Sequence, residues 1–299
     1  MKIVSLLPSA TELLGVLGLE DSLVAISHEC DTPKSVLHLP HATGSRIPAG
    51  LSQSEINAMV AESMAKGEPL YTVNAALIRD LKPDLVVTQG LCDVCAVTPD
   101  TIETSLRGIS CTLPASTKVI SLNGMSIQGI LDDLQTLADA TGTQTKAASA
   151  IQSARADLAS FPSPPSVQRL ALLEWMDPAY SPGHWVPEQI EAAGFESVLG
   201  RPGDHSRAMH WSEVKDAAPD GIGVICCGFG LEENAGFADS AILDENALGW
   251  FDGPIVAFDA NRFFSRPTLA VVDGAKRLQQ AFGAGQNSGD GFRRINPRD

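Results

Sequence analysis

The chain has 299 residues, a hydrophobic fraction of 44% and a net charge of −15 at pH 7. That length suits one large domain or two medium ones, and the hydrophobic content is enough for a sizeable core. The acidic balance excludes a surface that follows phosphates, so we expect neither nucleic acid nor an anionic membrane as a partner. No apolar run reaches the roughly 18 residues that a membrane-spanning helix needs, and no membrane insertion is expected.

The amino terminus shows no export signal. A short apolar run at residues 3–7 ends at Pro8, and neither a small-residue cleavage site nor a lipid-anchor cysteine precedes it. If Met1 is the natural start, we expect a cytoplasmic protein. Its six cysteines are then expected as thiols or metal ligands rather than as disulfides.

The first half has the pattern of an α/β lobe. Apolar runs predict buried strands at residues 2–7, 23–27, 85–88 and 119–122. Helical patterns predict helices at residues 9–17, 54–66 and 75–81. The residues between 32 and 72 otherwise have the composition of a loop. We take residues 1–123 as an N-terminal lobe.

Two helical patterns occupy the middle of the chain. An apolar stripe recurs every three or four residues from Ile127 to Ala138, and a second one runs from Ala147 to Leu158 beyond Gly142. The second helix, about 18 residues at 1.5 Å each, forms a rod of about 27 Å. Residues 124–165 are therefore predicted as a helical linker between two lobes. Two surface helices of one domain remain the alternative on the helices alone.

The second half repeats the plan of the first. Strands are predicted at residues 169–173, 222–225 and 255–258, and helices at residues 187–193, 212–217 and up to 282. A Pro-Asp turn precedes a buried strand in both halves, at Pro83-Asp84 and at Pro219-Asp220. This echo predicts a C-terminal lobe at residues 166–282 that resembles the first. The polar, glycine-rich residues 283–299 are predicted as a disordered tail.

The residues with chemical potential gather where strands end. In parallel α/β sheets, ligands bind beyond the carboxyl ends of the strands, so we expect these residues to line one cleft between the lobes. The candidate ligand-binding residues are Ser9, His28, Glu29, Cys30, Trp175, His184, Trp185, Cys227, Phe229, Arg262, Phe263 and Arg266. The two tryptophans suit a planar or bulky ligand, or are core aromatics. The two arginines suit a carboxylate or phosphate, or balance an acidic surface.

Cys92 and Cys95 have the spacing of half a tetrahedral thiolate site. No second such pair exists, because Cys226 and Cys227 are adjacent, so folding would have to supply the other ligands. The predicted metal set is His28, Cys92, Cys95 and His184. Two packed reduced cysteines and a redox pair remain the alternatives.

Catalysis is not expected, and no catalytic residues are assigned. A hydrolase needs a nucleophile beside a base, for which Cys30 or Cys92 with a histidine is the remaining arrangement. The chain has no GxSxG motif, no Walker loop and no GxGxxG after the first strand.

Three parts of the chain resemble the vitamin B12-type substrate-binding proteins of ABC importers, which belong to the helical-backbone class of metal and metal-chelate receptors. These parts are SLLPSATE at residues 5–12, LKPDLVV at residues 81–87, and the central linker. SHECD at 27–31, LCDVC at 91–95 and GHWVPE at 183–188 are similar to a subgroup labelled cobalamin-binding.

This resemblance implies an α/β fold of the class III periplasmic-binding-protein type, in which two similar lobes with parallel-rich sheets are joined by a long helical backbone. It also implies a non-catalytic protein that holds a cobalamin-like corrinoid or another metal chelate between the lobes. The rival hypothesis is direct binding of a transition metal such as zinc, cobalt or iron through Cys and His.

Two features depart from that family. Members that feed a transporter are exported, and they dock through a glutamate on each lobe. Ala76 and Ser212 stand at those places, with Glu213 one residue off. We therefore expect no docking to a B12-type permease.

Overall fold

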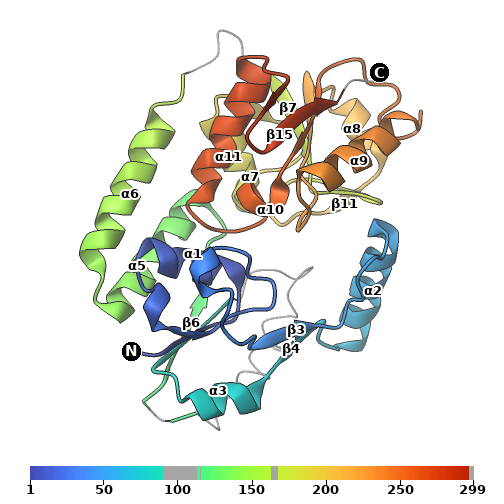
Figure 1. Ribbon diagram of the computed structural model, residues 1–299. Coiled ribbons are helices and arrows are strands. Elements are labelled where there is room, and N and C mark those ends of the chain that lie inside the picture. Colours follow the sequence, from blue (N-terminus) through green and yellow to red (C-terminus); the bar gives the residue numbers. More distant parts are fainter. Residues whose placement is uncertain (90–112, 115, 163–167, 296–299) are drawn as a thin grey trace. The chain divides into compact units, whose positions relative to one another are not determined.

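The computed structural model describes residues 1–89, 113–114, 116–162 and 168–295 (Figure 1). Contacts between residues divide the chain into two compact units. Unit 1 comprises Met1–Gly124 and Gly129–Ala150, and unit 2 comprises Met125–Gln128 and Ile151–Asp299. Each unit has a sheet of its own, so each is described by itself.

Unit 1 is built on a four-stranded parallel sheet with the order β2-β1-β5-β6. Its strands are β1 (Ile3–Ser5), β2 (Leu23–Ala25), β5 (Leu85–Gln89) and β6 (Lys118–Leu122). A separate antiparallel pair consists of β3 (Thr43–Ser45) and β4 (Tyr71–Val73). The helices of this unit before the central pair are α1 (Pro8–Val16), α2 (Gln53–Lys66) and α3 (Ala75–Leu81), with short 3₁₀ turns at Glu20–Ser22 and Lys34–Val36.

Local chemistry sets the ends of these helices. Pro8 occupies the first helical position of α1, where its fixed φ suits a helix and no N–H is missed. Ser52 and Glu55 form a reciprocal capping box at the start of α2, and Gly67 ends that helix in the left-handed conformation. The Asn74 side chain accepts a hydrogen bond from the Leu77 N–H and so caps α3.

The central helices are α5 (Ile127–Thr141) and α6 (Gln144–Ala159). The predicted apolar stripe of α5 is buried, and Gly142 separates the two helices with a φ of +72°. Lys146 in the first turn of α6 donates a hydrogen bond of 2.8 Å to the carbonyl of Leu17, just beyond α1. The two-unit division falls within α6, between Ala150 and Ile151. The boundaries predicted above at residues 123 and 165 stay a prediction.

Unit 2 is built on a six-stranded sheet with the order β10-β7-β12-β13-β15-β14. Its parallel strands are β7 (Arg169–Leu173), β10 (Glu196–Ser197), β12 (Gly221–Val224) and β13 (Ile255–Phe258), and its antiparallel ones are β14 (Ser288–Gly289) and β15 (Phe292–Ile295). A small antiparallel sheet contains β8 (Trp175–Met176), β9 (Ala179–Tyr180) and β11 (Ala208–Met209). The helices are α7 (Val186–Ala192), α8 (Trp211–Asp216), α9 (Leu231–Ile242), α10 (Ala260–Phe263) and α11 (Ala270–Leu278), the last continued by a π turn at Gln279–Gly283.

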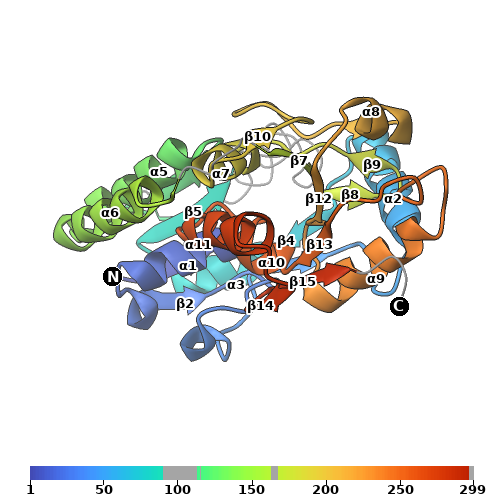
Figure 2. The same cartoon turned by 90° about the horizontal axis from the view of Figure 1, so that it is seen from above.

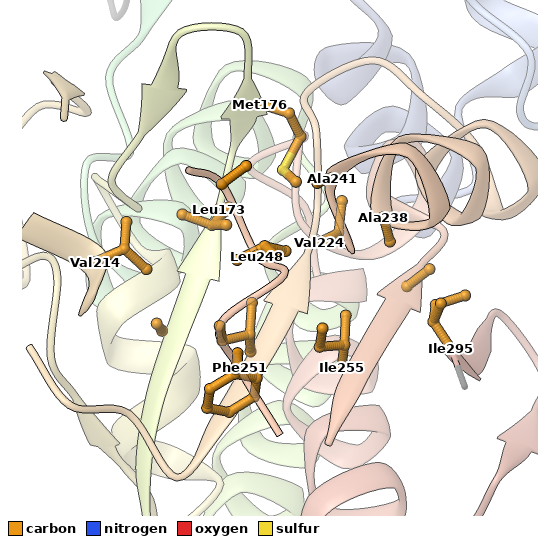
Figure 3. Packing of buried hydrophobic residues seen from close by; sticks show 14 of the residues in the cluster. Leu173, Met176, Val214, Val224, Ala238, Ala241, Leu248, Phe251, Ile255 and Ile295 are labelled. Carbon is orange, nitrogen blue, oxygen red and sulfur yellow. The ribbon is translucent and has the colours of Figure 1, made fainter. Parts of the chain in front are cut away.

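Helices cover both faces of the large sheet in unit 2, with α8 and α9 on one face and α7 and α11 on the other (Figure 2). On the first face, Leu173, Val224 and Ile255 from three neighbouring strands pack against small residues of α9 such as Ala238 (Figure 3). On the second face, side chains of the neighbouring strands fill the space beside Gly223 of β12. A Cβ on Gly223 would lie 2.2 Å from a methyl carbon of Leu172.

Residues 283–295 contradict the predicted disordered tail. β15 pairs in antiparallel register with β13, and Phe292 is fully buried against Phe258, with ring centroids 6.1 Å apart. Asp290, in the turn before β15, accepts hydrogen bonds of 2.8 Å from Arg262 and from Arg277. The sequence did not predict this strand, because its composition is polar and glycine-rich and only Phe292 and Ile295 are buried apolar residues.

Other elements of the structure were not predicted either. The helix α9 buries Ala235, Ala238 and Ala241, whose small side chains give only a weak hydrophobic pattern. The two-stranded sheet β3–β4 and the three-stranded sheet β8–β9–β11 consist of strands of two or three residues. Such strands are too short for an alternating pattern to be visible in the sequence. None of the helices in the described part of the chain has the length and apolar character needed to cross a membrane.

Replacing Phe292 with Ala tests whether this C-terminal strand is part of the core. We expect the free energy of unfolding to fall by about 3–5 kcal/mol, since a large buried side chain is removed from between packed neighbours. Urea unfolding followed by circular dichroism measures the change. Arg293→Ala is the matched control, because its ion pair with Glu232 is exposed and should contribute less than about 1 kcal/mol. Equal stabilities of the two variants would contradict the assignment.

Candidate functional site

Three strand exits of unit 2 meet at the carboxyl edge of its sheet. The N–H of Cys227 after β12 donates to the carbonyl of Glu174 after β7, at 3.0 Å. The N–H of Asn261 after β13 donates to the carbonyl of Phe229, also at 3.0 Å. These backbone bonds join loops that are far apart in the sequence, so the side chains on them have fixed relative positions.

An aromatic pair lies on these exits. The rings of Trp175 and Phe229 are both half-buried, with centroids 5.6 Å apart and planes tilted by 51°. Behind them, Phe237 of α9 packs its ring edge-to-face against Phe229, with centroids 5.0 Å apart. The pair therefore has a packed side toward the core and a partly exposed side.

The carboxylate of Glu174 holds a second loop at this edge. Its Oε1 accepts a hydrogen bond of 3.0 Å from the N–H of Gly183, and its Oε2 accepts one from the hydroxyl of Ser206. Gly183 is required here, because a Cβ at this position would lie 2.4 Å from the backbone nitrogen of Ser206. One carboxylate thus fixes two segments that are more than twenty residues apart.

His184 follows Gly183 in a conformation that side chains rarely adopt. Its φ is +54°, a left-handed value that costs a residue other than glycine roughly 1–2 kcal/mol. Its N–H donates to the carbonyl of Asp204 at 2.7 Å, and its own carbonyl accepts from the N–H of Gly203 at 2.9 Å. These reciprocal bonds offset the strain.

The imidazole of His184 is largely buried beside a second histidine. Burial and, less strongly, the neighbouring His205 lower its pKa below the usual 6.5, so the ring is neutral at pH 7. The buried Nε2 has no hydrogen-bond partner among the residues that the structure describes.

Of four other candidates of unit 2, Trp185 and Phe263 are engaged in its own packing, and Arg262 and Arg266 lie nearer the surface. Trp185 is 6% exposed and donates its indole N–H to the carbonyl of Phe264 at 3.0 Å. Phe263 is 2% exposed, with the guanidinium of Arg262 at 4.7 Å from its ring centroid. These contacts are those of core residues. Arg266 is half-buried, in the turn that leads to α11.

The candidates of unit 1 form a separate polar cluster. Nδ1 of His28 lies 2.8 Å from the hydroxyl of Thr43, which also accepts from the N–H of His28 at 3.1 Å. Burial lowers the pKa of His28, Glu29 raises it and His41 lowers it, with a net result below 6.5. Within the described residues its buried Nε2 makes no hydrogen bond, and the nearest carboxylate oxygen is that of Glu29 at 3.9 Å.

Cys30 and Ser9 lie by the start of α1. The thiol of Cys30 is 3.2 Å from the hydroxyl of Thr11, which in turn donates to the hydroxyl of Ser5 at 2.8 Å. Ser9 is buried in the first turn of the helix. The side chain of Cys30 is half-buried.

The predicted four-ligand metal set stays a prediction. Cys92 and Cys95 lie outside the described residues, and His28 and His184 belong to different units. Among the residues that are described, no group of three or more His, Cys, Asp or Glu side chains has the arrangement of a metal site.

The sequence reasoning overlooked Glu174, Gly183, His205 and Ser206. Glu174 directly follows the strand at residues 169–173, which is the signal that could have singled it out. Ser206 and His205 occupy a polar loop with no periodic pattern, so only the fold brings them to Glu174 and His184.

Comparison with known proteins places the chain in a family. The model of the family described as periplasmic binding protein matches residues 3–249. The periplasmic heme binding protein HutB of Vibrio cholerae is 20% identical, with a TM-score of 0.66 over 94% of this chain and 98% of that one. The periplasmic vitamin B12 binding protein BtuF of Vibrio cholerae is also 20% identical, with a TM-score of 0.63 over 96% and 98% of the two chains.

Two further similar proteins differ in how much of this chain they match. A possible iron-binding, periplasmic solute-binding protein of Staphylococcus epidermidis is 17% identical, with a TM-score of 0.66 over 93% of this chain and 97% of that one. A glycerol-3-phosphate dehydrogenase [NAD(P)+] of Mesorhizobium japonicum is 32% identical over 114 residues, which are 34% of this chain and 33% of that one. The chain thus spans about a third of that curated relative, too little for an argument about its activity.

These findings decide several expectations. The predicted family resemblance and the two-lobed α/β fold class are confirmed. A non-catalytic binding protein is confirmed at the level of the family, which is one of binding proteins. The expectation of a cytoplasmic protein is wrong, because the family is periplasmic and the similar structures carry that location in their descriptions. The apparent lack of an export signal, on which that expectation rested, is not a reliable guide here.

The family match covers most of the sequence, and the shared fold extends over more than nine-tenths of it. The chain belongs to the periplasmic binding protein family.

Proposed function

We propose that this protein binds a cobalamin-like corrinoid or another metal chelate, without transforming it. The observation that carries the proposal is the partly exposed aromatic pair, Trp175 and Phe229, at the carboxyl edge of the sheet in unit 2. Aromatic faces of this kind stack on large, flat, apolar ligands, and the carboxyl edge is where α/β sheets bind them.

The aromatic pair is built to stay in place. Phe237 supports Phe229 from behind, and the backbone bonds from Cys227 to Glu174 and from Asn261 to Phe229 fix the loops that carry the pair. A preorganised surface loses little entropy when a ligand binds, which favours affinity. Polar residues lie on the same loops, among them Cys227 and Ser265, whose hydroxyl accepts from the N–H of Gly228 at 3.1 Å, and such groups suit the amide rim of a corrinoid.

The charge of the chain bears on which chelate fits. A net charge of −15 disfavours a ligand with several negative charges, because long-range repulsion slows its approach. The side chains of a corrinoid are mostly neutral amides. Charge therefore favours a corrinoid over a polyanionic metal chelate.

In unit 1, His28 is the candidate whose ring keeps one nitrogen available to a ligand. His28 is neutral near pH 7 because its pKa is lowered, and Thr43 orients its ring through Nδ1. This leaves Nε2 as the nitrogen that faces no protein hydrogen-bond partner among the described residues. The prediction that the chain does not dock to a B12-type permease rested on the apparent lack of an export signal and on Ala76 and Ser212, and it stays a prediction.

The second candidate function is direct binding of a transition metal such as zinc, cobalt or iron. It is favoured by the two imidazoles of His28 and His184, each with a lowered pKa and a buried Nε2 that lacks a hydrogen-bond partner in the described residues. Neutral imidazole is the form that binds metal. The predicted ligand set adds Cys92 and Cys95 as thiolates, and it stays a prediction.

Titration with cyanocobalamin, followed by quenching of tryptophan fluorescence, tests the corrinoid proposal. We expect saturable binding that Trp175→Ala weakens by about tenfold, since the loss of one stacked aromatic costs roughly 1.4 kcal/mol. Trp250→Ala is the matched control, because Trp250 lies in the loop that leads to the amino end of β13. The absorption spectrum of protein isolated from its own host should show a corrinoid. A colourless protein that does not respond to cyanocobalamin would refute the proposal.

Changing Cys92 and Cys95 to Ser separates the two candidate functions. If the protein binds a chelate, the double variant should bind cyanocobalamin no more than a few-fold more weakly than the parent. If it binds a bare metal, elemental analysis should show the metal in the parent and not in the variant, because thiolate ligands dominate such a site. Retention of metal by the variant would exclude the four-ligand set.

A further inference from the structure

Two histidines of unit 2, His184 and His205, lie together beside the loop that Glu174 holds. Their rings are perpendicular, with centroids 5.3 Å apart. Imidazole nitrogens bind a divalent transition metal at about 2.0–2.1 Å, and a tetrahedral angle between two such bonds puts the ring centroids about 5 Å apart. The observed spacing would fit two imidazoles around one ion, and it also lies in the range of ordinary edge-to-face ring packing.

The backbone holds this pair in place from both sides. The N–H and the carbonyl of His184 bond to Asp204 and Gly203, the two residues that precede His205. The carboxylate of Glu174 bonds to Gly183 and Ser206, which flank the pair on its outer sides. The left-handed conformation of His184 is kept by these bonds. Such preorganisation is what a metal site needs from its surroundings.

One nitrogen of the pair is already free of competing bonds. Nε2 of His184 is buried and has no hydrogen-bond partner in the described part of the chain. A buried polar nitrogen without a partner costs free energy unless something binds it. His205 is exposed, so an ion can reach the pair from solvent.

We propose that His184 and His205 together bind a divalent transition-metal ion. No third His, Cys, Asp or Glu joins them within the described residues, so the remaining positions belong to water or to donors of a chelate. Imidazole suits nickel, copper and zinc. The site goes beyond the corrinoid proposal, because a corrin ring occupies the four equatorial positions of its cobalt and leaves two positions on opposite faces. Two neighbouring imidazoles need two adjacent positions.

The metal therefore arrives either as a hydrated ion or in a chelate that leaves adjacent positions open. Nickel chloride and nickel nitrilotriacetate represent these two sources. The protein is used at full length, without a histidine tag, after removal of metal with EDTA, and with Cys92 and Cys95 changed to Ser so that thiolates do not contribute.

Isothermal titration with each probe measures the affinity. We expect His205→Ala to weaken binding of at least one probe by about tenfold or more, since one of two protein ligands is lost. His38→Ala is the matched control, because His38 is an exposed histidine of unit 1, and it should leave the affinity unchanged. The more strongly affected probe identifies the source of the metal.

Two outcomes would overturn the site: no binding of either probe by the parent, or equal losses in the His205 and His38 variants. Cyanocobalamin binding by the His205→Ala variant is measured in parallel and should match the parent. Failure of the metal site is thus distinguishable from failure of the corrinoid proposal.

Discussion

The hydrogen bonds of the Glu174 carboxylate hold together the loops at the carboxyl edge of the sheet in unit 2. The carboxylate stands at the end of β7 and accepts hydrogen bonds from Gly183 and Ser206, so a single side chain joins the sheet to both ends of the segment that begins with His184 and ends with His205. The backbone carbonyl of Glu174 accepts a hydrogen bond from the N–H of Cys227, which joins β7 to the exit of β12. A half-buried carboxylate needs such partners to offset its desolvation, and the loop needs the carboxylate to hold its shape.

Beneath this edge, the sheet of unit 2 must be rigid enough to position it. The strands are buried on both faces, by α8 and α9 on one side and by α7 and α11 on the other (Figure 2). Gln189 of α7 donates from its amide to the carbonyls of Phe263 and Val271, and so ties α7 to the helices that follow β13. The antiparallel strand β15 adds a further anchor, because Phe292 fills the same layer as Phe258. The exits of β7, β12 and β13 therefore rest on a packed base.

Much of this fold could be read from the sequence, and the reasons are specific. Buried parallel strands such as β5 and β12 are continuous apolar runs, and α5 has an unbroken stripe, so both are visible without a structure. The strand β15 was missed because its four residues have only two anchors, and α9 because alanines make up most of its buried face. Local pattern does not reveal elements whose burial is decided by distant partners.

The sequence predicts which strand ends carry the candidate residues, but not the contacts that their side chains make. Their role in binding stays a prediction. Candidates were placed at strand ends, which is where Trp175, Cys227 and Phe229 lie. Trp185 and Phe263 stand near the same ends in sequence, yet their side chains point into the core, since the helices that they begin or end turn them inward. His205 could not be predicted as a candidate from the sequence. It lies beside His184 only because two backbone hydrogen bonds join segments that are about twenty residues apart.

The two ligand chemistries proposed for this protein make opposite demands on geometry. A planar macrocycle needs a flat aromatic surface and contributes its own metal ligands, and Trp175 with Phe229 offers such a surface. A metal with adjacent open positions needs two donor atoms on one side, which is what His184 and His205 offer. The aromatic pair is held by backbone bonds and the histidine pair by the Glu174 carboxylate and by backbone bonds of its own, so substitutions at Trp175 and at His205 are expected to act on different ligands. A substitution of the Glu174 side chain removes the carboxylate bonds to Gly183 and Ser206 but keeps the backbone carbonyl that accepts from Cys227, so it is expected to disturb the histidine pair more than the aromatic pair.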